Sequence, residues 1–390
     1  MPNLQKKSML SLMAAAIFVI SLNLRPAISS IGPLLEAMRQ DLSLTNSEVS
    51  LLTSVPVFCM GLFAPFAVSF NRLFGIKRSV TLLLVGIGVF TLLRGLVPSY
   101  FVLMASAFFI GLVIAIMGPL ISAMIKQNFP TRTASLIGVY SFGLGLGATL
   151  AAGLTGVFYV WADWPFALAS WSVLAIAGIW LWLRVKQPEQ PVMETEIVEA
   201  GGKSPWKNKR AWYMLLFFGF QSALFFSLIT WLAPIAMEKG MSVLTASALL
   251  TVMSAVQLGG NLSIPLLLEK FPSRTLWTGV SLAFGLVGIL LLLFGNLSFI
   301  WIAAACLGLT LGGLFPIALL MPLDENSTAE GVNSWASMIQ FGGYVISGVM
   351  PVAIGMSYDK FGNHDISLGV LLVFIVLLSV FTFLLHQKRQ

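Results

Sequence analysis

Charged residues are scarce in this sequence. Of 390 residues, 9% are charged and 58% are hydrophobic, whereas soluble domains carry roughly 25% charged residues. The mean hydropathy is +0.93. A soluble fold could not bury that much apolar surface, so the composition excludes a soluble protein and favours one that lies in a membrane.

Histidine and cysteine are also rare, with two of each. We place His364 in a loop and His386 in the tail, and Cys59 and Cys306 fall in separate apolar segments. Residues so far apart give no metal cluster, catalytic triad or disulfide framework, and no glycine-rich phosphate loop with lysine occurs. We therefore predict no enzyme activity, cofactor or metal, and we expect transport to run on a gradient.

Apolar segments long enough to cross a bilayer recur along the whole chain. A spanning helix takes about 20 residues, whereas barrel strands are about 10 residues of alternating polarity. We predict an all-α integral membrane protein with about twelve transmembrane helices. The expected spans are 9–36, 49–70, 79–96, 101–124, 134–159, 166–184, 211–236, 245–267, 276–294, 299–321, 332–357 and 366–385. The first is too long for a signal-peptide core, so we expect it to be retained.

Basic residues are distributed unevenly between the two sides that these spans define. The side opposite the chain ends carries only Arg39, Lys239 and Lys360. The side of the chain ends carries Lys6, Lys7, Arg72, Lys77, Arg78, Lys126, Arg132, Arg184, Lys186, Lys203, Lys207, Lys209, Arg210, Lys270, Arg274, Lys388 and Arg389. Because cytoplasmic loops carry the excess of Lys and Arg, we predict cytoplasmic termini in a bacterial cytoplasmic (inner) membrane. The net charge of +7 thus reflects topology and gives no reason to expect nucleic-acid binding.

A polar stretch divides the chain into two halves of similar length. We predict an N-terminal six-helix bundle at 1–184, a cytoplasmic linker at 185–210 and a C-terminal six-helix bundle at 211–390. Glycine, proline and polar residues recur between the halves at offsets of 197 to 200. The matching pairs are Gly111 and Gly308, Pro119 and Pro316, Gly143 and Gly342, Gly156 and Gly355, Thr45 and Thr245, Ser47 and Ser247, and Pro65 and Pro265. Three segments with nearly one offset indicate a duplicated unit, an arrangement typical of transporters with a midplane site.

Several motifs carry a resemblance to a known family. They are Asn23-Leu24-Arg25-Pro26, Ile31-Gly32-Pro33-Leu34-Leu35 and Leu51-Leu52-Thr53-Ser54-Val55-Pro56. With the duplicated halves, the chain resembles the major facilitator superfamily over its whole length, and within it the cyanate permease and 2-nitroimidazole transporter branch. The resemblance implies a transporter of cyanate-like or planar compounds. The loop at 71–78 keeps Gly75 and the basic end of the family pattern but has Arg72 at the usual acidic position, so the usual gating interaction of that Asp is not carried over.

Two formal charges lie well inside predicted spans. An arginine at the bilayer centre costs from about 2.5 to well over 10 kcal/mol, so it usually faces a cavity or a partner. Arg94 is close to the end of its span, which favours interface anchoring or packing between helices. Arg25 is near the middle of the first span with no acid at comparable depth, which favours a role in substrate binding. The alternative is a structural arginine bonded to broken-helix carbonyls, because Pro26 removes a backbone donor and frees the carbonyl of Leu22.

Polar side chains of the C-terminal half follow single helix faces. The clearest face, in the eleventh predicted span, is Asn333, Ser337, Gln340, Tyr344 and Ser347 at steps of four and three. Hydrogen bonds between helices account for some such residues. Aromatic residues that could stack on a flat substrate are Phe142, Phe225 and Trp231, but aromatic residues are too numerous in this sequence for any one of them to be informative. The predicted substrate-binding residues are Arg25, Gln221, Gln257, Asn261, Gln340, Tyr344, Tyr140 and Ser141.

A buried guanidinium without a carboxylate favours an anion or a planar, electron-rich solute. We therefore predict a secondary active transporter of a small solute, most simply a small anion such as cyanate, that works by alternating access in the lipid bilayer. A coupling proton is compatible with the sequence, and no oligomeric state is predicted. One alternative is an exporter of neutral drugs or nitroheterocycles with a structural Arg25. Another is a membrane receptor that moves nothing, which the short loops disfavour.

Overall fold

The computed structural model describes residues 2–185, 204–326 and 329–386, and within these ranges the chain forms helices joined by short connections. Twelve helical segments are long and apolar enough to cross a bilayer. The predicted fold class, an all-α integral membrane protein with twelve spans, is therefore confirmed.

The first six spans make up what we call the N-terminal half, residues 2–185. Its first span is broken into three helices, α1 (Pro2–Asn23), α2 (Pro26–Ser29) and α3 (Ile31–Asp41). The remaining elements are α4 (Asn46–Phe63), α5 (Phe66–Leu96), α6 (Tyr100–Asn128), η1 (Pro130–Arg132), α7 (Thr133–Trp161), α8 (Trp164–Ala169) and α9 (Ser172–Arg184).

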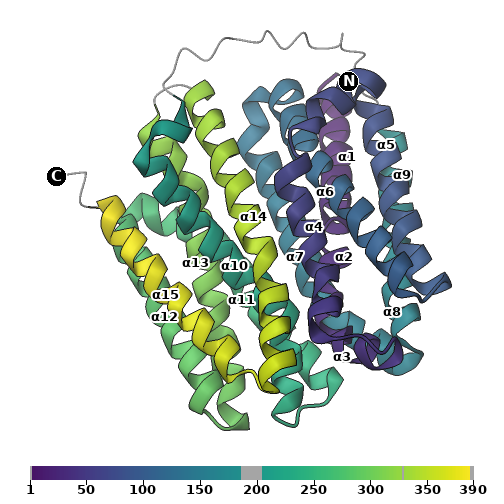
Figure 1. Cartoon of the computed structure of the whole chain (residues 1–390). Helices are drawn as coiled ribbons and strands as arrows, with labels where there is room; N and C mark the ends of the chain where they lie inside the picture. Colours follow the sequence, from purple (N-terminus) through teal and green to yellow (C-terminus); the bar gives the residue numbers. More distant parts are fainter. Residues whose placement is uncertain (1, 186–203, 327–328, 387–390) are drawn as a thin grey trace.

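The last six spans make up the C-terminal half, residues 204–386. Its elements are η2 (Pro205–Lys207), α10 (Lys209–Glu238), α11 (Val243–Lys270), α12 (Arg274–Phe294), η3 (Leu297–Phe299), α13 (Ile300–Glu325), α14 (Ala329–Phe361) and α15 (Asp365–His386). Figure 1 shows the purple and blue helices of the first half on one side of the molecule and the green and yellow helices of the second on the other.

Several helix ends differ from the predicted spans. The second span is interrupted at Pro65, and its last residues join the third span in α5, because proline lacks the backbone donor that would continue the ladder. Within α5 the chain turns at Gly75, whose φ of 70° suits a residue without a Cβ. The helix α10 begins at Lys209, one residue before the predicted end of the linker, since the Asn208 side chain accepts a hydrogen bond from the backbone N–H of Arg210. Linker residues 186–203 lie outside the described ranges.

The even number of spans puts the start of α1 and the end of α15 on one side of the helix bundle. We call this side the terminal face. The opposite side, where α4 and α11 begin and α14 ends, is the distal face. The two names carry no assumption about which compartment each face meets.

Glycines at matching positions of the two halves make matching contacts. In α6, a methyl group at Gly111 would lie 2.5 Å from the Cα of Pro56 in α4. In α13, a methyl group at Gly308 would lie 2.5 Å from the carbonyl oxygen of Met253 in α11. The fourth span of each half therefore approaches the second span of that half closely at equivalent places.

The halves meet closely on the distal side of the molecule. A side chain at Gly32 of α3 would collide with the carbonyl oxygen of Ile229 in α10. In the same way Gly156 of α7 lies against Ser247 of α11, and Gly355 of α14 lies against Asn46 of α4. Three helix pairs thus close the distal half of the interface through glycine.

Toward the terminal face, α7 and α11 separate. Along the face of α7 that meets α11, Gly145 still lies against Leu258. Two turns further, Gly138 has open space where a side chain would be. On α11 the same stripe continues to Leu262 and Leu266, which are 48% and 66% exposed. Between α7 and α11 the interface is therefore closed at the distal face and opens toward the terminal face, whereas Gly61 of α4 still lies against Phe341 of α14.

Candidate functional site

A break in the first span presents Arg25. The backbone leaves helical hydrogen bonding at Leu24 and Arg25, and the single turn α2 begins with Pro26. Because Pro26 has no N–H, the carbonyl of Leu22 loses its helical donor. That carbonyl faces α7, where a methyl group at Gly147 would lie 2.5 Å from its oxygen. The break is thus seated directly against a glycine of the fifth span.

Two buried polar side chains hold the backbone on either side of Arg25. Before it, Asn23 donates from Nδ2 to the carbonyl oxygens of Val19 (2.7 Å) and of Leu174 in α9 (2.9 Å). After it, Arg94 of α5 donates from Nη1 to the carbonyl oxygen of Ala27 in α2 at 2.8 Å. These bonds fix the otherwise irregular segment in one position.

Arg94 packs between helices of the N-terminal half. Its side chain is 1% exposed, and its Nε donates to the Ser106 hydroxyl at 2.8 Å. It therefore joins α5, α6 and α2, which agrees with the predicted packing role and not with anchoring at the membrane interface.

Arg25 itself is half-buried and points to aromatic groups. Its guanidinium carbon lies 5.6 Å from the centre of the Phe225 ring in α10, within the range of cation–π attraction. Its charge also acts on the phenols of Tyr140 in α7 and Tyr344 in α14. Within the described ranges it has no hydrogen bond or ion pair, so its five N–H groups are available to a solute.

Groups from three helices, α7 of the N-terminal half and α10 and α14 of the C-terminal half, therefore lie near Arg25. Tyr140 packs its hydroxyl near Gly118 of α6, where a methyl group would lie 3.2 Å away. Tyr344 stands edge-on to Phe218 of α10, with ring centres 5.3 Å apart. Of the predicted substrate-binding residues, the structure brings Arg25, Tyr140 and Tyr344 together.

The predicted residue Gln221 lies on the same face of α10 as this aromatic wall. It sits between Phe218 and Phe225 at helical spacing, is 2% exposed and donates from Nε2 to Ser222 at 3.3 Å. Its Oε1 is buried without a hydrogen-bond partner in the described chain. A buried amide oxygen without a donor is costly, so a solute or water donor fits at this position.

In the described parts of the chain, no hydrogen bond or ion pair joins the other predicted residues to Arg25. On α11, Gln257 and Asn261 are half-buried, and Asn261 keeps a buried Oδ1 without a partner. On α14, Gln340 is half-buried, and on α7 Ser141 is exposed. Asn261, Gln340 and Ser141 lie on the terminal side of the helix middles, and Gln257 lies beside Leu258, where α7 and α11 still meet.

The three aromatic residues singled out in the sequence have different surroundings. The ring of Phe142 stacks on Phe18 with centres 6.1 Å apart. Trp231 is buried and donates to the carbonyl oxygen of Pro351 at 2.9 Å. Only Phe225 faces Arg25. The sequence signal for Phe225 was its place on a face of α10 that repeats aromatic and amide residues. Such a face also occurs in ordinary helix packing, so it could not identify Phe225 as the residue that meets Arg25.

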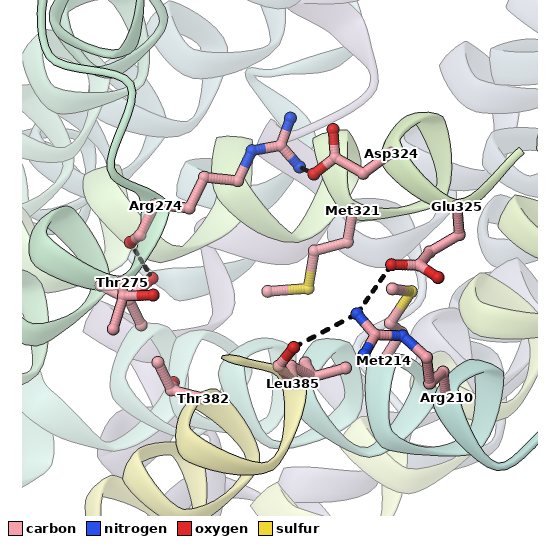
Figure 2. Close-up of a pocket in the computed structure, with 10 residues that line it drawn as sticks. Arg210, Met214, Arg274, Thr275, Met321, Asp324, Glu325, Thr382 and Leu385 are labelled. Carbon is pink, nitrogen blue, oxygen red and sulfur yellow. Dashed lines mark hydrogen bonds and ion pairs between the residues drawn. The ribbon is translucent and has the colours of Figure 1, made fainter. Parts of the chain in front are cut away.

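A second polar cluster, at the terminal face of the C-terminal half, lines a cavity of about 60 Å³. Figure 2 shows Arg210 directed at Glu325 and Arg274 directed at Asp324, with Met321 between the pairs. Arg210 donates to Glu325 at 2.7 Å and to the carbonyl oxygen of Leu385 at 3.2 Å. Each arginine has a carboxylate partner, so the cluster joins the ends of α10, α12, α13 and α15 and differs in kind from the unpaired Arg25.

Within the described ranges, no three His, Cys, Asp or Glu side chains come together as a metal-binding cluster. The groups at this place are the Arg25 guanidinium, the phenols of Tyr140 and Tyr344 and the Phe225 ring, with the Gln221 amide one turn from Phe225 on α10. This set can bind a small anion or planar molecule by hydrogen bonds and stacking.

Comparison with known proteins agrees with this architecture. The family model described as Major Facilitator Superfamily matches residues 12–348. The cyanate transport protein CynX of Escherichia coli (strain K12) is 30% identical over 361 residues, which cover 90% of this chain and 91% of that protein. The 2-nitroimidazole transporter of the same organism is 28% identical, with 94% and 93% covered. An uncharacterised transporter, YycB, of Bacillus subtilis (strain 168) is 27% identical, with 97% and 94% covered.

Solved structures share the fold. A point mutant of the nucleoside transporter NupG superposes with a TM-score of 0.78 at 12% identity, covering 97% of this chain and all of that one. A D-xylose–proton symporter gives 0.77 at 13% identity, covering 96% and 97%. At such low identity these likenesses speak for the fold alone.

Proposed function

Because this chain belongs to the major facilitator superfamily, we propose that it is a secondary active transporter of a small planar anion, with cyanate as the leading candidate. The two halves, predicted as residues 1–184 and 211–390, are the units that move. They alternate around a site formed by Arg25, Tyr140, Gln221, Phe225 and Tyr344.

The observation that carries this proposal is the unpaired guanidinium of Arg25. A cation inside the bilayer needs a partner, and in the described parts of the chain the Arg25 guanidinium faces the Phe225 ring, with the phenols of Tyr140 and Tyr344 within electrostatic range. A planar anion can accept parallel hydrogen bonds from the guanidinium and stack beside the phenyl ring. The relatives named for cyanate and 2-nitroimidazole transport support a small planar solute.

Gln257, Asn261, Gln340 and Ser141 form the polar approach to this site. They lie on α11, α14 and α7, from the level of the contact between Gly145 and Leu258 toward the terminal face. We assign the terminal face to the cytoplasm of a bacterium, because the basic loops lie on that side. In this orientation, the conformation described is open to the cytoplasm.

Coupling to a proton gradient is compatible with this site. Its described side chains include no carboxylate at the depth of Arg25, so a coupling proton would travel on the solute or on bound water.

A neutral nitroheterocycle is the second candidate solute, favoured by the 28% identity to the 2-nitroimidazole transporter and by the aromatic wall of α10. In that case transport would not depend on the Arg25 guanidinium. The two candidates differ in whether transport needs the positive charge at position 25.

Counterflow of labelled cyanate into proteoliposomes tests the proposal. The variants are Arg25→Ala and Arg25→Lys, with Arg39→Ala as a control, because Arg39 is partly exposed and pairs with Glu36 in its own helix. We expect loss of counterflow in Arg25→Ala, partial activity in Arg25→Lys, which keeps the charge but loses the planar fork, and normal activity in the control. Wild-type counterflow by Arg25→Ala would refute the anion site.

A further inference from the structure

Asp359 joins the two halves at the distal face. It lies in the last turns of α14 and faces the start of α4. Its Oδ1 accepts hydrogen bonds from the backbone N–H and the Nδ2 of Asn46, both at 2.8 Å. Its Oδ2 accepts from the backbone N–H of Ser47 at 2.9 Å and from the Ser47 hydroxyl at 2.8 Å. One carboxylate thus receives four donors from the other half.

The location strengthens these bonds. The first backbone N–H groups of a helix lack intrahelical acceptors and carry partial positive charge, and hydrogen bonds to a charged acceptor exceed neutral ones. One turn before Asp359, Gly355 lets α14 reach α4, since a methyl group there would lie 2.6 Å from the carbonyl oxygen of Asn46. Close backbone approach and the carboxylate therefore act at the same point.

Other charges near Asp359 are largely committed elsewhere. Arg39 of α3 is within electrostatic range of Asp359 but pairs with Glu36 at 2.7 Å. Glu48 of α4 is also within range and accepts from the backbone N–H of Thr45 at 2.8 Å. The bond between the halves at this point is therefore made by Asp359 itself.

The equivalent place in the other half has no such carboxylate. The repeat that matches Gly355 with Gly156, an offset of 199, matches Asp359 with Val160, which is 62% exposed. Gly156 still packs on Ser247, the counterpart of Ser47. Since this helix pair packs without a carboxylate, Asp359 is an addition to the fold and its loss should leave folding intact.

We infer that Asp359 is a latch residue that holds the distal face closed and biases the resting protein toward the conformation open at the terminal face. No acidic residue occurs in the basic loop at 71–78, which follows the second span at the terminal end, to favour the opposite state in the same way. The inference rests on the proposed alternation of the halves but not on the identity of the solute.

Distance measurements between spin labels test the latch. Labels at Leu96→Cys and Ser298→Cys mark the distal ends of the two halves, and both native cysteines are buried. In full-length protein in lipid nanodiscs, we expect Asp359→Asn to raise the ratio of long to short distances by about ten-fold or more, as loss of charged hydrogen bonds implies. Gly355→Ala, which forces α14 from α4 without changing charge, should shift the ratio in the same direction.

Asp163→Asn is the matched control. Asp163 also caps a helix start at the distal face, accepting from the backbone N–H of Phe166 at 2.8 Å, but within its own half. We expect it to leave the distances unchanged. Unchanged distances in Asp359→Asn, or an equal shift in Asp163→Asn, would overturn the latch. Absence of cyanate counterflow would refute the proposed solute and leave this result standing.

Discussion

Two arginines lie close together in the N-terminal half and have different roles. Arg94 is enclosed by its own half and commits two of its donors to Ala27 and Ser106. Arg25, two residues before Ala27, keeps its donors free of protein acceptors within the described ranges. Arg94 holds the broken segment of the first span in place, and Arg25 extends from that segment to the interface between the halves.

Arg94→Met should destabilise the protein by about 2 kcal/mol, because the Ala27 carbonyl and the Ser106 hydroxyl lose charged donors in a buried place. The free energy of unfolding of Arg94→Lys should lie between those of Arg94→Met and the wild type. Chemical unfolding of purified protein measures the difference. A variant more stable than wild type would mean that the cost of burying the guanidinium exceeds the value of its hydrogen bonds.

Some of these residues could be picked out from the sequence, and others could not. Arg25 stood out because a charge deep in an apolar segment is costly, and Pro26 marked the break beside it. Phe225 could not be told from Phe142 and Trp231, because its contact with Arg25 depends on how α10 crosses the first span. The partners of Asp359 are more than 300 positions away in sequence, so no local pattern could connect them.

Among the helices, the contact of α1 with α7 seats the break. Gly143 and Gly147 face this contact, at the spacing that lets two helices approach closely. We expect Gly147→Ala to destabilise the protein by more than about 1 kcal/mol, since its methyl group would meet the Leu22 carbonyl at 2.5 Å.

Gly138→Ala on the same helix is the control for this prediction. Its methyl group would enter open space, and alanine favours a helix over glycine by up to about 1 kcal/mol. Thermal unfolding should therefore show a loss for Gly147→Ala and no loss for Gly138→Ala. Equal behaviour of the two variants would contradict the close contact.

The ends of the helices were harder to predict than their number, because proline and glycine interrupt helices inside apolar segments. The twelve spans follow from runs of apolar residues, whose lengths are set by the bilayer. The interruption at Pro65 and the turn at Gly75 displaced the ends of the second and third spans, because a hydrophobicity pattern continues across a kink that changes the backbone direction. The packing of Gly111 and Gly308 matches the repeat seen in the sequence.

At the scale of the whole molecule, we expect the stability of the folded protein to depend on pH, because a histidine is buried at the distal face. His364 is 5% exposed and stands against Tyr358, with ring centres 4.4 Å apart. The Glu238 carboxylate, 3.6 Å away, would favour the charged imidazole, but burial has the larger effect and lowers the pKa of His364 to about 4. Its folded pKa is thus below the unfolded value of about 6.5, so the unfolded chain binds more protons between these pH values.

Stability should therefore be complete above about pH 6.5 and fall as the pH drops toward about 4. Unfolding temperatures recorded across this range should decline in the wild type and decline less in His364→Gln, which cannot take up the proton. A decline of the same size in His364→Gln would assign it to other groups.

The central claim is that Arg25, placed at a helix break between two moving halves, binds a small planar anion. The most direct measurement is stabilisation of purified protein against unfolding by added cyanate, in the wild type and in Arg25→Ala. A ligand at a hundred times its dissociation constant stabilises by about 2.7 kcal/mol. We predict that stabilisation in the wild type and none in Arg25→Ala at the same concentration. Equal stabilisation of both proteins would contradict the claim.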